Sequence, residues 1–186
     1  MLNAMRIVYI DADFATATGE TGPRSFAFAR RLMARGHDVM MLTSDRQFDI
    51  PSDAEQVFRT QVEGVPVTAI GVGLGRHKTR VRQIWRHLHF AVATARYLLE
   101  SPKPDVVYVT SPPLSAIIPA MLNKWLRKVP FVLEVREIWP EVPHGIDQIR
   151  SRVLVFLLRQ LALLGYRRAT AIVGLTNAAI NHIQAD

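Results

Sequence analysis

The stretch PFVLEVREIWPE, residues 130–141, begins as a buried β-strand and ends in charged side chains and a Trp-Pro pair. Its apolar part predicts an inner strand of a parallel sheet. Open α/β sheets bind ligands outside the carboxyl ends of their strands. Glu134, Arg136 and Glu137 gather at such an end, and packing alone gives no reason for three charges there. The stretch therefore predicts both the fold class and the position of a site.

Strands and helices alternate along the rest of the chain. Strands are predicted at Arg6–Ile10, Asp38–Thr43, Val57–Val62, Val65–Ile70, Asp105–Val109, Phe131–Val135 and Ala171–Leu175. Helices are predicted from Pro23 to a cap at Gly36, over Arg76–Leu99, Leu114–Arg127 and Ile149–Arg168, and from Asn177 onward. This alternation predicts an α/β fold, with a Rossmann-like, mostly parallel sheet and helices on both faces.

Composition limits the classes of partner. The 186 residues suit one domain of ordinary size, and no cysteine is present to form disulfides or thiolate metal sites. The net charge of +7 favours anionic partners such as phosphates, acidic lipid headgroups or nucleic acid. Nucleic acid is the least favoured of these, because the chain carries no nucleic-acid recognition motif.

The loop after the first strand, residues 11–24, contains Gly19 and Gly22. Both glycines let the backbone approach a ligand closely, and the helix that follows has free N–H groups that favour phosphate. The alternative is an ordinary surface loop, because the spacing is neither GxGxxG nor a P-loop. Asp11 and Asp13 match a DxD pattern, which in some sugar transferases holds a divalent cation; we expect no metal here.

Three further positions at strand ends are candidates for chemistry. Arg136 has the guanidinium fork that pairs with a carboxylate or phosphate. Glu137 lies just beyond the strand, where a general base or an oxocarbenium-stabilising carboxylate would act. Ser111 follows another predicted strand and could donate to a ligand. The alternatives are an ion-paired helix cap for the charges and a rigid turn for Ser111.

The helix predicted from Arg76 carries Arg76, Lys78, Arg80 and Arg82 beside apolar and aromatic residues. A basic helix of this kind can lie on an anionic membrane surface. The same pattern also fits a solvated helix that packs its apolar stripe on the sheet.

The chain resembles the N-terminal domain of family 4 glycosyltransferases of the GT-B architecture, and most closely the bacterial enzymes of surface-polysaccharide and lipopolysaccharide synthesis. The resemblance extends from Met5 to the end of the chain. Its landmarks are MRIVYI (Met5–Ile10), ARRLMARGHDVMMLTS (Ala29–Ser44), PDVVYVTSPPL (Pro104–Leu114), PFVLEVREIWPE (Pro130–Glu141) and YRRATAIVGLT (Tyr166–Thr176).

The resemblance implies that residues 5–186 form a Rossmann-like acceptor-side domain, one half of a GT-B enzyme. A second, donor-binding domain would complete the cleft, and transfer from a nucleotide-sugar would need neither cofactor nor metal. Gly19 and Gly22 would approach the donor diphosphate, and Arg24 matches a basic residue at the first helix. Glu137, where the family commonly has Asp, would face the cleft. With Asp13, it is a candidate catalytic residue.

Residues 1–4 are expected to be an extension or an alternative start, because Met5 opens the resemblance. The donor-binding domain is expected to be missing from this chain, so we expect an acceptor-binding half, inactive alone, as a fragment or a subunit. It would serve cell-surface polysaccharide synthesis with a lipid-linked or saccharide acceptor, in the cytoplasm or on the cytoplasmic face of the inner membrane. The alternative is a non-catalytic module or regulatory subunit that binds a phospho-sugar or nucleotide.

Overall fold

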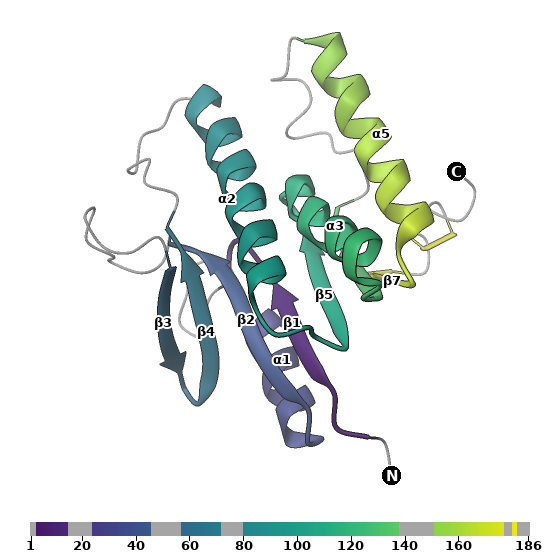
Figure 1. Ribbon diagram of the computed structural model, residues 1–186. Helices are drawn as coiled ribbons and strands as arrows, with labels where there is room; N and C mark the ends of the chain where they lie inside the picture. Colours follow the sequence, from purple (N-terminus) through teal and green to yellow (C-terminus); the bar gives the residue numbers. More distant parts are fainter. Residues whose placement is uncertain are drawn as a thin grey trace.

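A computed structural model of the chain describes residues 3–14, 24–45, 57–71, 80–137, 151–176 and 180–181. These residues build a seven-stranded sheet with helices on both faces (Figure 1). The α/β, Rossmann-like fold class predicted from the alternation of strands and helices is therefore confirmed.

The strands lie in the order β3-β4-β2-β1-β5-β6-β7, and every neighbouring pair is parallel except β3 with β4. They are β1 (Arg6–Ile10), β2 (Asp38–Ser44), β3 (Val57–Val62), β4 (Val65–Ile70), β5 (Val106–Ser111), β6 (Phe131–Val135) and β7 (Ala171–Gly174). The parallel strands follow the order 3-2-1-4-5-6 of a Rossmann sheet. Strand β3 extends this sheet as the outer strand of a hairpin with β4.

The helices divide between the two faces of the sheet. They are α1 (Arg24–Ala34), α2 (Arg80–Glu100), the 3-10 turn η2 (Leu114–Ala116), α3 (Ile117–Arg127) and α5 (Arg152–Arg168). Helix α1 packs on one face through Phe26 and Ala29, in a core layer that includes Tyr9 and Met41. Helices α2, α3 and α5 cover the other face, over a larger layer of aliphatic side chains (Figure 1).

Two predicted turns have the backbone that their residues favour. Gly36 follows α1 with φ of +87°, the left-handed conformation of a helix C-cap. Glu63 and Gly64 between β3 and β4 both have positive φ, as a two-residue hairpin turn requires.

Some predicted boundaries need correction. The single helix predicted over residues 114–127 is divided into η2 and α3. Pro119 lies in the first turn of α3, where its missing N–H costs no helical hydrogen bond. Strand β5 also extends two residues past the predicted end at Val109, so Thr110 and Ser111 belong to the sheet.

The strand order fixes where a ligand site is expected. After β4 the chain crosses through α2 and returns beside β1, so β1 and β5 are neighbours whose connections leave to opposite sides. A crevice at the carboxyl ends of such strands is the usual ligand position in open α/β sheets. Of the described helices, none combines the length and the apolarity that crossing a membrane demands.

Candidate functional site

Glu134 in β6 is the centre of a polar cluster at the carboxyl ends of β1, β5 and β6. Its side chain is only 2 % exposed. The hydroxyls of Tyr9 and Thr110 each donate to its Oε2 atom over 3.1 Å. Nε of Arg24, the first residue of α1, lies 2.9 Å from Oε1. Each oxygen of this buried carboxylate therefore has a partner, as a buried charge requires.

Asp11 directly follows β1 and is equally buried. Its Oδ2 atom pairs with Nη2 of Arg136 at 3.2 Å, and its Oδ1 atom accepts the backbone N–H of Asp13 at 3.1 Å. Nε of Arg136 also lies 3.7 Å from Oε1 of Glu134. Arg136 therefore joins the two carboxylates.

The result is an alternating chain of charges, Arg24–Glu134–Arg136–Asp11, which we call the carboxyl-edge cluster. Two buried acids are balanced by two arginines, so the internal charges compensate. Arg24 is 53 % exposed and Arg136 is 22 % exposed. The acids thus lie inside the fold, while both arginine side chains are partly exposed.

Burial shifts the proton equilibria of this cluster. Burial raises the pKa of Asp11, and the neighbouring Arg136 and Ser25 only partly oppose this. Burial and the charge of Glu134 raise the pKa of Tyr9 and of Tyr108 well above the ordinary value. Both phenols therefore stay neutral near pH 7, and Tyr9 can act only as a hydrogen-bond donor toward Glu134.

This arrangement suits recognition of an anion. Each arginine is fixed by a buried carboxylate, so little side-chain freedom remains to be lost on binding. Guanidinium groups pair with phosphate and carboxylate through planar, charge-assisted hydrogen bonds. The cluster can hold a negatively charged group at the carboxyl ends of the strands, because the side chains of Arg24 and Arg136 are partly exposed.

The structure brings some of the predicted site residues together and leaves others apart. Arg24 and Arg136 come together around Glu134. Ser111 does not join them: its side chain is buried, and its Oγ atom has no hydrogen-bond partner among the described residues. Because strand side chains alternate and Thr110 contacts Glu134, Ser111 points to the opposite sheet face. Only its carbonyl approaches the cluster, accepting the N–H of Arg136 at 3.1 Å.

The two candidate catalytic residues lie at the edges of the cluster. Asp13 is partly exposed, and its backbone N–H donates to Asp11. Glu137 is exposed and immediately follows Arg136, beyond the end of β6. Their catalytic roles remain predictions.

Other predicted positions fall outside the described residues. These are Gly19 and Gly22 in the first loop, and Arg76 and Lys78 before α2. Arg80 and Arg82 lie in the first turn of α2, but only their backbone is described. The phosphate contact and the membrane contact predicted for these residues therefore remain predictions.

Sequence reasoning missed Tyr9 and Thr110, and it did not join Asp11 to Glu134 in one site. The available signal was a spacing of two residues at the ends of inner strands. Tyr9 and Asp11 have this spacing, and so do Glu134 and Arg136. Residues with this spacing share a sheet face. What the pattern lacked was the neighbour order of the strands, which brings β1, β5 and β6 together.

In the Asp11-Ala-Asp13 pattern, the Oδ1 atom of Asp11 accepts the backbone N–H of Asp13. Asp11 is engaged by Arg136, and within the described ranges no group of three His, Cys, Asp or Glu residues is placed to hold a metal. The described residues thus favour anion recognition by arginine at this edge.

Comparison with known proteins bears on the family and the fold of the chain. The family model described as "Glycosyl transferase 4-like domain" matches residues 19–186. No curated protein matches the chain. Among solved structures, the chain is similar to sucrose-phosphate synthase from Thermosynechococcus elongatus, with a TM-score of 0.62 and 12 % sequence identity over 97 % of this chain.

The match covers 45 % of that synthase, so the chain spans less than half the length of this structural neighbour. At this identity the likeness shows the fold alone, a Rossmann-like α/β domain. The family match, in contrast, covers most of the chain, which therefore belongs to the family of glycosyl transferase 4-like domains.

Proposed function

We propose that the chain is the N-terminal, acceptor-binding half of a glycosyltransferase. The complete enzyme moves a sugar from a nucleotide-sugar to a lipid-linked or saccharide acceptor in cell-surface polysaccharide synthesis. The observation that carries this proposal is the carboxyl-edge cluster, which presents two arginines at the switch point of the sheet in a chain of this family.

The cluster supports binding of a phosphorylated acceptor. A lipid-linked acceptor carries its phosphate or diphosphate next to the saccharide, so an anion site on the acceptor side fixes the distance to the reacting hydroxyl. Fixing this geometry is a large part of what an enzyme contributes to a bimolecular transfer. In this proposal Arg24 and Arg136 bind the phosphate, while Glu134 and Asp11 hold the arginines in position.

Glu137 and Asp13 are the residues that we assign to the chemistry itself. Glu137 is exposed at the end of β6, beside Arg136. In this position its carboxylate can act on the acceptor hydroxyl as a general base, or stabilise positive charge at the anomeric carbon. Asp13, at the end of β1, would act from the other side of the same edge. The transfer would use no metal.

The donor would be held by a second, Rossmann-like domain or subunit across the cleft, with Gly19 and Gly22 approaching its diphosphate. The 186-residue chain alone would then lack one wall of the site and show little or no transfer. We place the enzyme in the cytoplasm or at the cytoplasmic face of the inner membrane, where Arg76, Lys78, Arg80 and Arg82 would face anionic lipid.

Isothermal titration tests the acceptor role of the chain. A soluble farnesyl-diphosphate-linked sugar serves as acceptor probe, and UDP serves as nucleotide probe. We expect the acceptor probe to bind, and Arg24→Gln to weaken it about tenfold through loss of a charge-assisted contact. The matched control is Arg31→Gln, an exposed position on α1 outside the cluster; this variant should bind like the parent chain.

Two results would contradict the proposal. Tight binding of UDP with no binding of the acceptor probe would instead favour a non-catalytic nucleotide-binding module. Ordinary transfer rates in a single-turnover assay of this chain alone, with nucleotide-sugars and lipid acceptors, would contradict the need for a second domain.

A further inference from the structure

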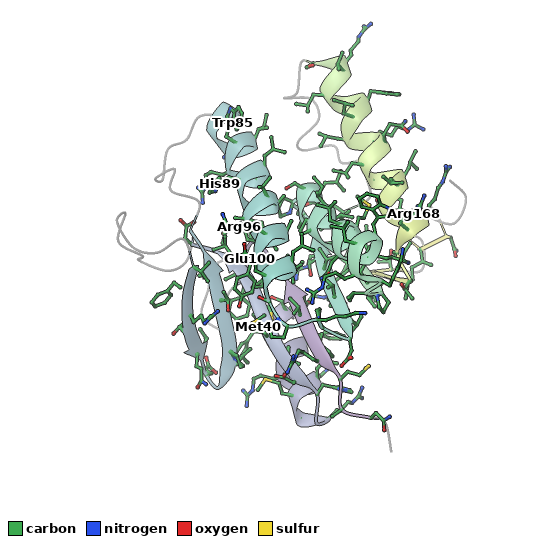
Figure 2. The ribbon with its side chains drawn as sticks, in the orientation of Figure 1. Met40, Trp85, His89, Arg96, Glu100 and Arg168 are labelled. Atoms are coloured by element: carbon green, nitrogen blue, oxygen red, sulfur yellow. The ribbon has the colours of Figure 1, made fainter. Side chains whose placement is uncertain are left out.

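A groove of about 650 Å³ opens between α3 and α5, on the sheet face opposite the one that carries Glu134. Its walls are mostly apolar and include Met121, Trp125 and Leu164, while Lys124, Lys128 and Arg168 contribute basic groups to the lining. Arg168 lies at the end of α5 that leads into β7 (Figure 2). Because β7 runs parallel to β6, this end of α5 leads to the amino ends of the strands. The groove is therefore separate from the carboxyl-edge cluster.

Large apolar side chains are exposed beside this groove. Trp125 on α3 is 69 % exposed, and Phe156 on α5 is 58 % exposed. Val153, Leu157 and Leu164 on α5 are exposed as well. On a helix of 3.6 residues per turn these three positions fall within about 40° of arc. They form one apolar stripe along α5, and the stripe enters the groove at Leu164.

The charge around this stripe has one sign. The helices α3 and α5 lie in sequence segments 106–133 and 151–176, and neither segment contains Asp or Glu. Their basic residues are Lys124, Arg127, Lys128, Arg152, Arg159, Arg167 and Arg168. Lys124 donates to the carbonyl of Arg168 at 2.7 Å and so fixes the end of α5, while Arg159 and Arg167 are exposed.

We propose that this surface docks on an anionic phospholipid bilayer. We call it the α3–α5 face and define it by Trp125, Val153, Phe156, Leu157 and Leu164 with the basic residues around them. Exposed aromatic and aliphatic groups enter the boundary between headgroups and acyl chains, and Lys and Arg around them attract acidic headgroups. Tryptophan in particular is favoured at the membrane interface.

A second copy of the chain fits this face poorly. A two-fold dimer brings the same patch of both subunits together. Here it would bring basic side chains against basic side chains with no acidic residue in either segment to compensate. An acidic lipid surface supplies the missing negative charge.

Membrane docking through the α3–α5 face is independent of the transfer reaction. Vesicle binding requires neither donor nor acceptor, and failure of docking would leave the proposed acceptor role intact. The stripe on α5 runs from Leu164 toward Val153, at the end of the helix nearer the carboxyl ends of the strands.

Co-sedimentation of the 186-residue chain with vesicles tests the proposal. One set of vesicles contains phosphatidylcholine only, and the other contains phosphatidylglycerol in addition. We expect binding to the anionic vesicles and release at high salt, because salt screens exposed charges. Equal binding to both sets, or no binding to either, would overturn the proposal.

Two pairs of variants locate the contact. The double variant Trp125→Ala/Phe156→Ser removes apolar groups from the α3–α5 face. Its control is Phe58→Ser, at an exposed position on β3. The double variant Arg159→Gln/Arg167→Gln removes two charges from the face. Its control, Arg31→Gln/Arg35→Gln, removes two charges from α1 and the turn that follows it, on the other side of the sheet. We expect about tenfold weaker partitioning for each α3–α5 variant and little change for its control.

Unfolding curves of all variants separate loss of binding from loss of fold. Equal loss in the α1 charge control would overturn the proposal, because it would mean diffuse attraction by the whole chain. Sedimentation velocity tests whether a second copy of the chain occupies the face instead. A dimer of the parent chain that dissociates in the double variant Trp125→Ala/Phe156→Ser would assign the face to a second copy. For the proposed face, brominated lipids should quench tryptophan emission less in Trp125→Phe than in the parent chain.

Discussion

Nε of Arg24, in the first turn of α1, lies 2.9 Å from the buried Oε1 atom of Glu134 in β6. This contact joins the start of the first helix to a strand far along the chain, across β1 and β5. It places one positive charge of the carboxyl-edge cluster at the surface and its counter-charge inside the fold. In our proposal, stability and anion binding are thus coupled through the same pair.

Replacement of Glu134 with Gln should destabilise the chain. The substitution removes the negative charge that Arg24 and Arg136 share, and breaking a buried pair is costly. Because both arginines are partly exposed and can regain water, we expect a loss of about 2 kcal/mol rather than the full cost of a buried pair. Urea unfolding measures it.

The control for this loss is Glu100→Gln, which breaks the exposed pair with Arg96 on α2. Surface pairs of this kind contribute less than about 1 kcal/mol. If both substitutions cost the same, Glu134 is not the centre of a structured cluster.

Removal of the Tyr9 hydroxyl should also destabilise the chain, through loss of its hydrogen bond to Glu134. Tyr9→Phe keeps the ring that packs on Tyr108 at 4.6 Å between centroids, and loses only the hydrogen bond to Glu134. We expect a loss of about 1 kcal/mol in the free energy of unfolding. In the double variant with Glu134→Gln, the two losses of stability should be less than additive, because the Tyr9 hydroxyl no longer donates to a carboxylate once Glu134 is replaced. Strict additivity in this double-mutant cycle would argue against the contact.

The pH dependence of stability should report Asp11. Burial raises its pKa above the ordinary value of 3.8, so between 3.8 and the raised pKa the folded chain binds more protons than the unfolded chain. Stability from this group is therefore lost as pH rises through that window. We expect the advantage of the parent chain over Asp11→Asn to shrink as pH rises and then to level off.

Urea unfolding of both proteins over a pH series gives this difference directly. An advantage that grows with rising pH would mean that pairing with Arg136 outweighs burial and lowers the pKa of Asp11.

Gly36 should tolerate no side chain without cost. Its φ is +87°, and a Cβ atom there would meet no neighbour within 4 Å. The cost of Gly36→Ala is thus one of backbone conformation alone, about 1 kcal/mol for a residue forced into the left-handed region. Gly36→Asn should cost less, because Asn adopts this conformation more readily. Thermal unfolding compares the two, and equal midpoints for Ala and Gly would refute the cap.

Much of the fold could be predicted because its signals are local. β-Branched runs such as that of β1, and breakers such as Gly36 and Glu63-Gly64, mark the elements wherever they lie. The division between η2 and α3 was missed because Leu114 to Ile117 have no residue that distinguishes a 3-10 turn from the start of an α-helix. Such endings depend on how the segment packs on β5.

The candidate site was predicted only in part. Arg136 and Arg24 were identified because charges at strand and helix ends stand out in the sequence. Glu134 was interpreted as one of several charges at the strand end. The residues around it in the sequence do not indicate that its side chain contacts Tyr9 and Thr110. Those contacts depend on strand order, which the sequence pattern does not contain. Ser111 was predicted to follow its strand, and its place inside β5 turns its hydroxyl away.

The most direct test of the central claim follows the arginine side chains by NMR during acceptor binding. The Nε–H resonances of Arg24 and Arg136 are monitored while the farnesyl-diphosphate-linked sugar is added to the chain. If the carboxyl-edge cluster binds the acceptor phosphate, both resonances shift together and saturate with the same Kd as the calorimetric titration. Saturable shifts confined to arginines of α2 or α5, with Arg24 and Arg136 unmoved, would contradict the account.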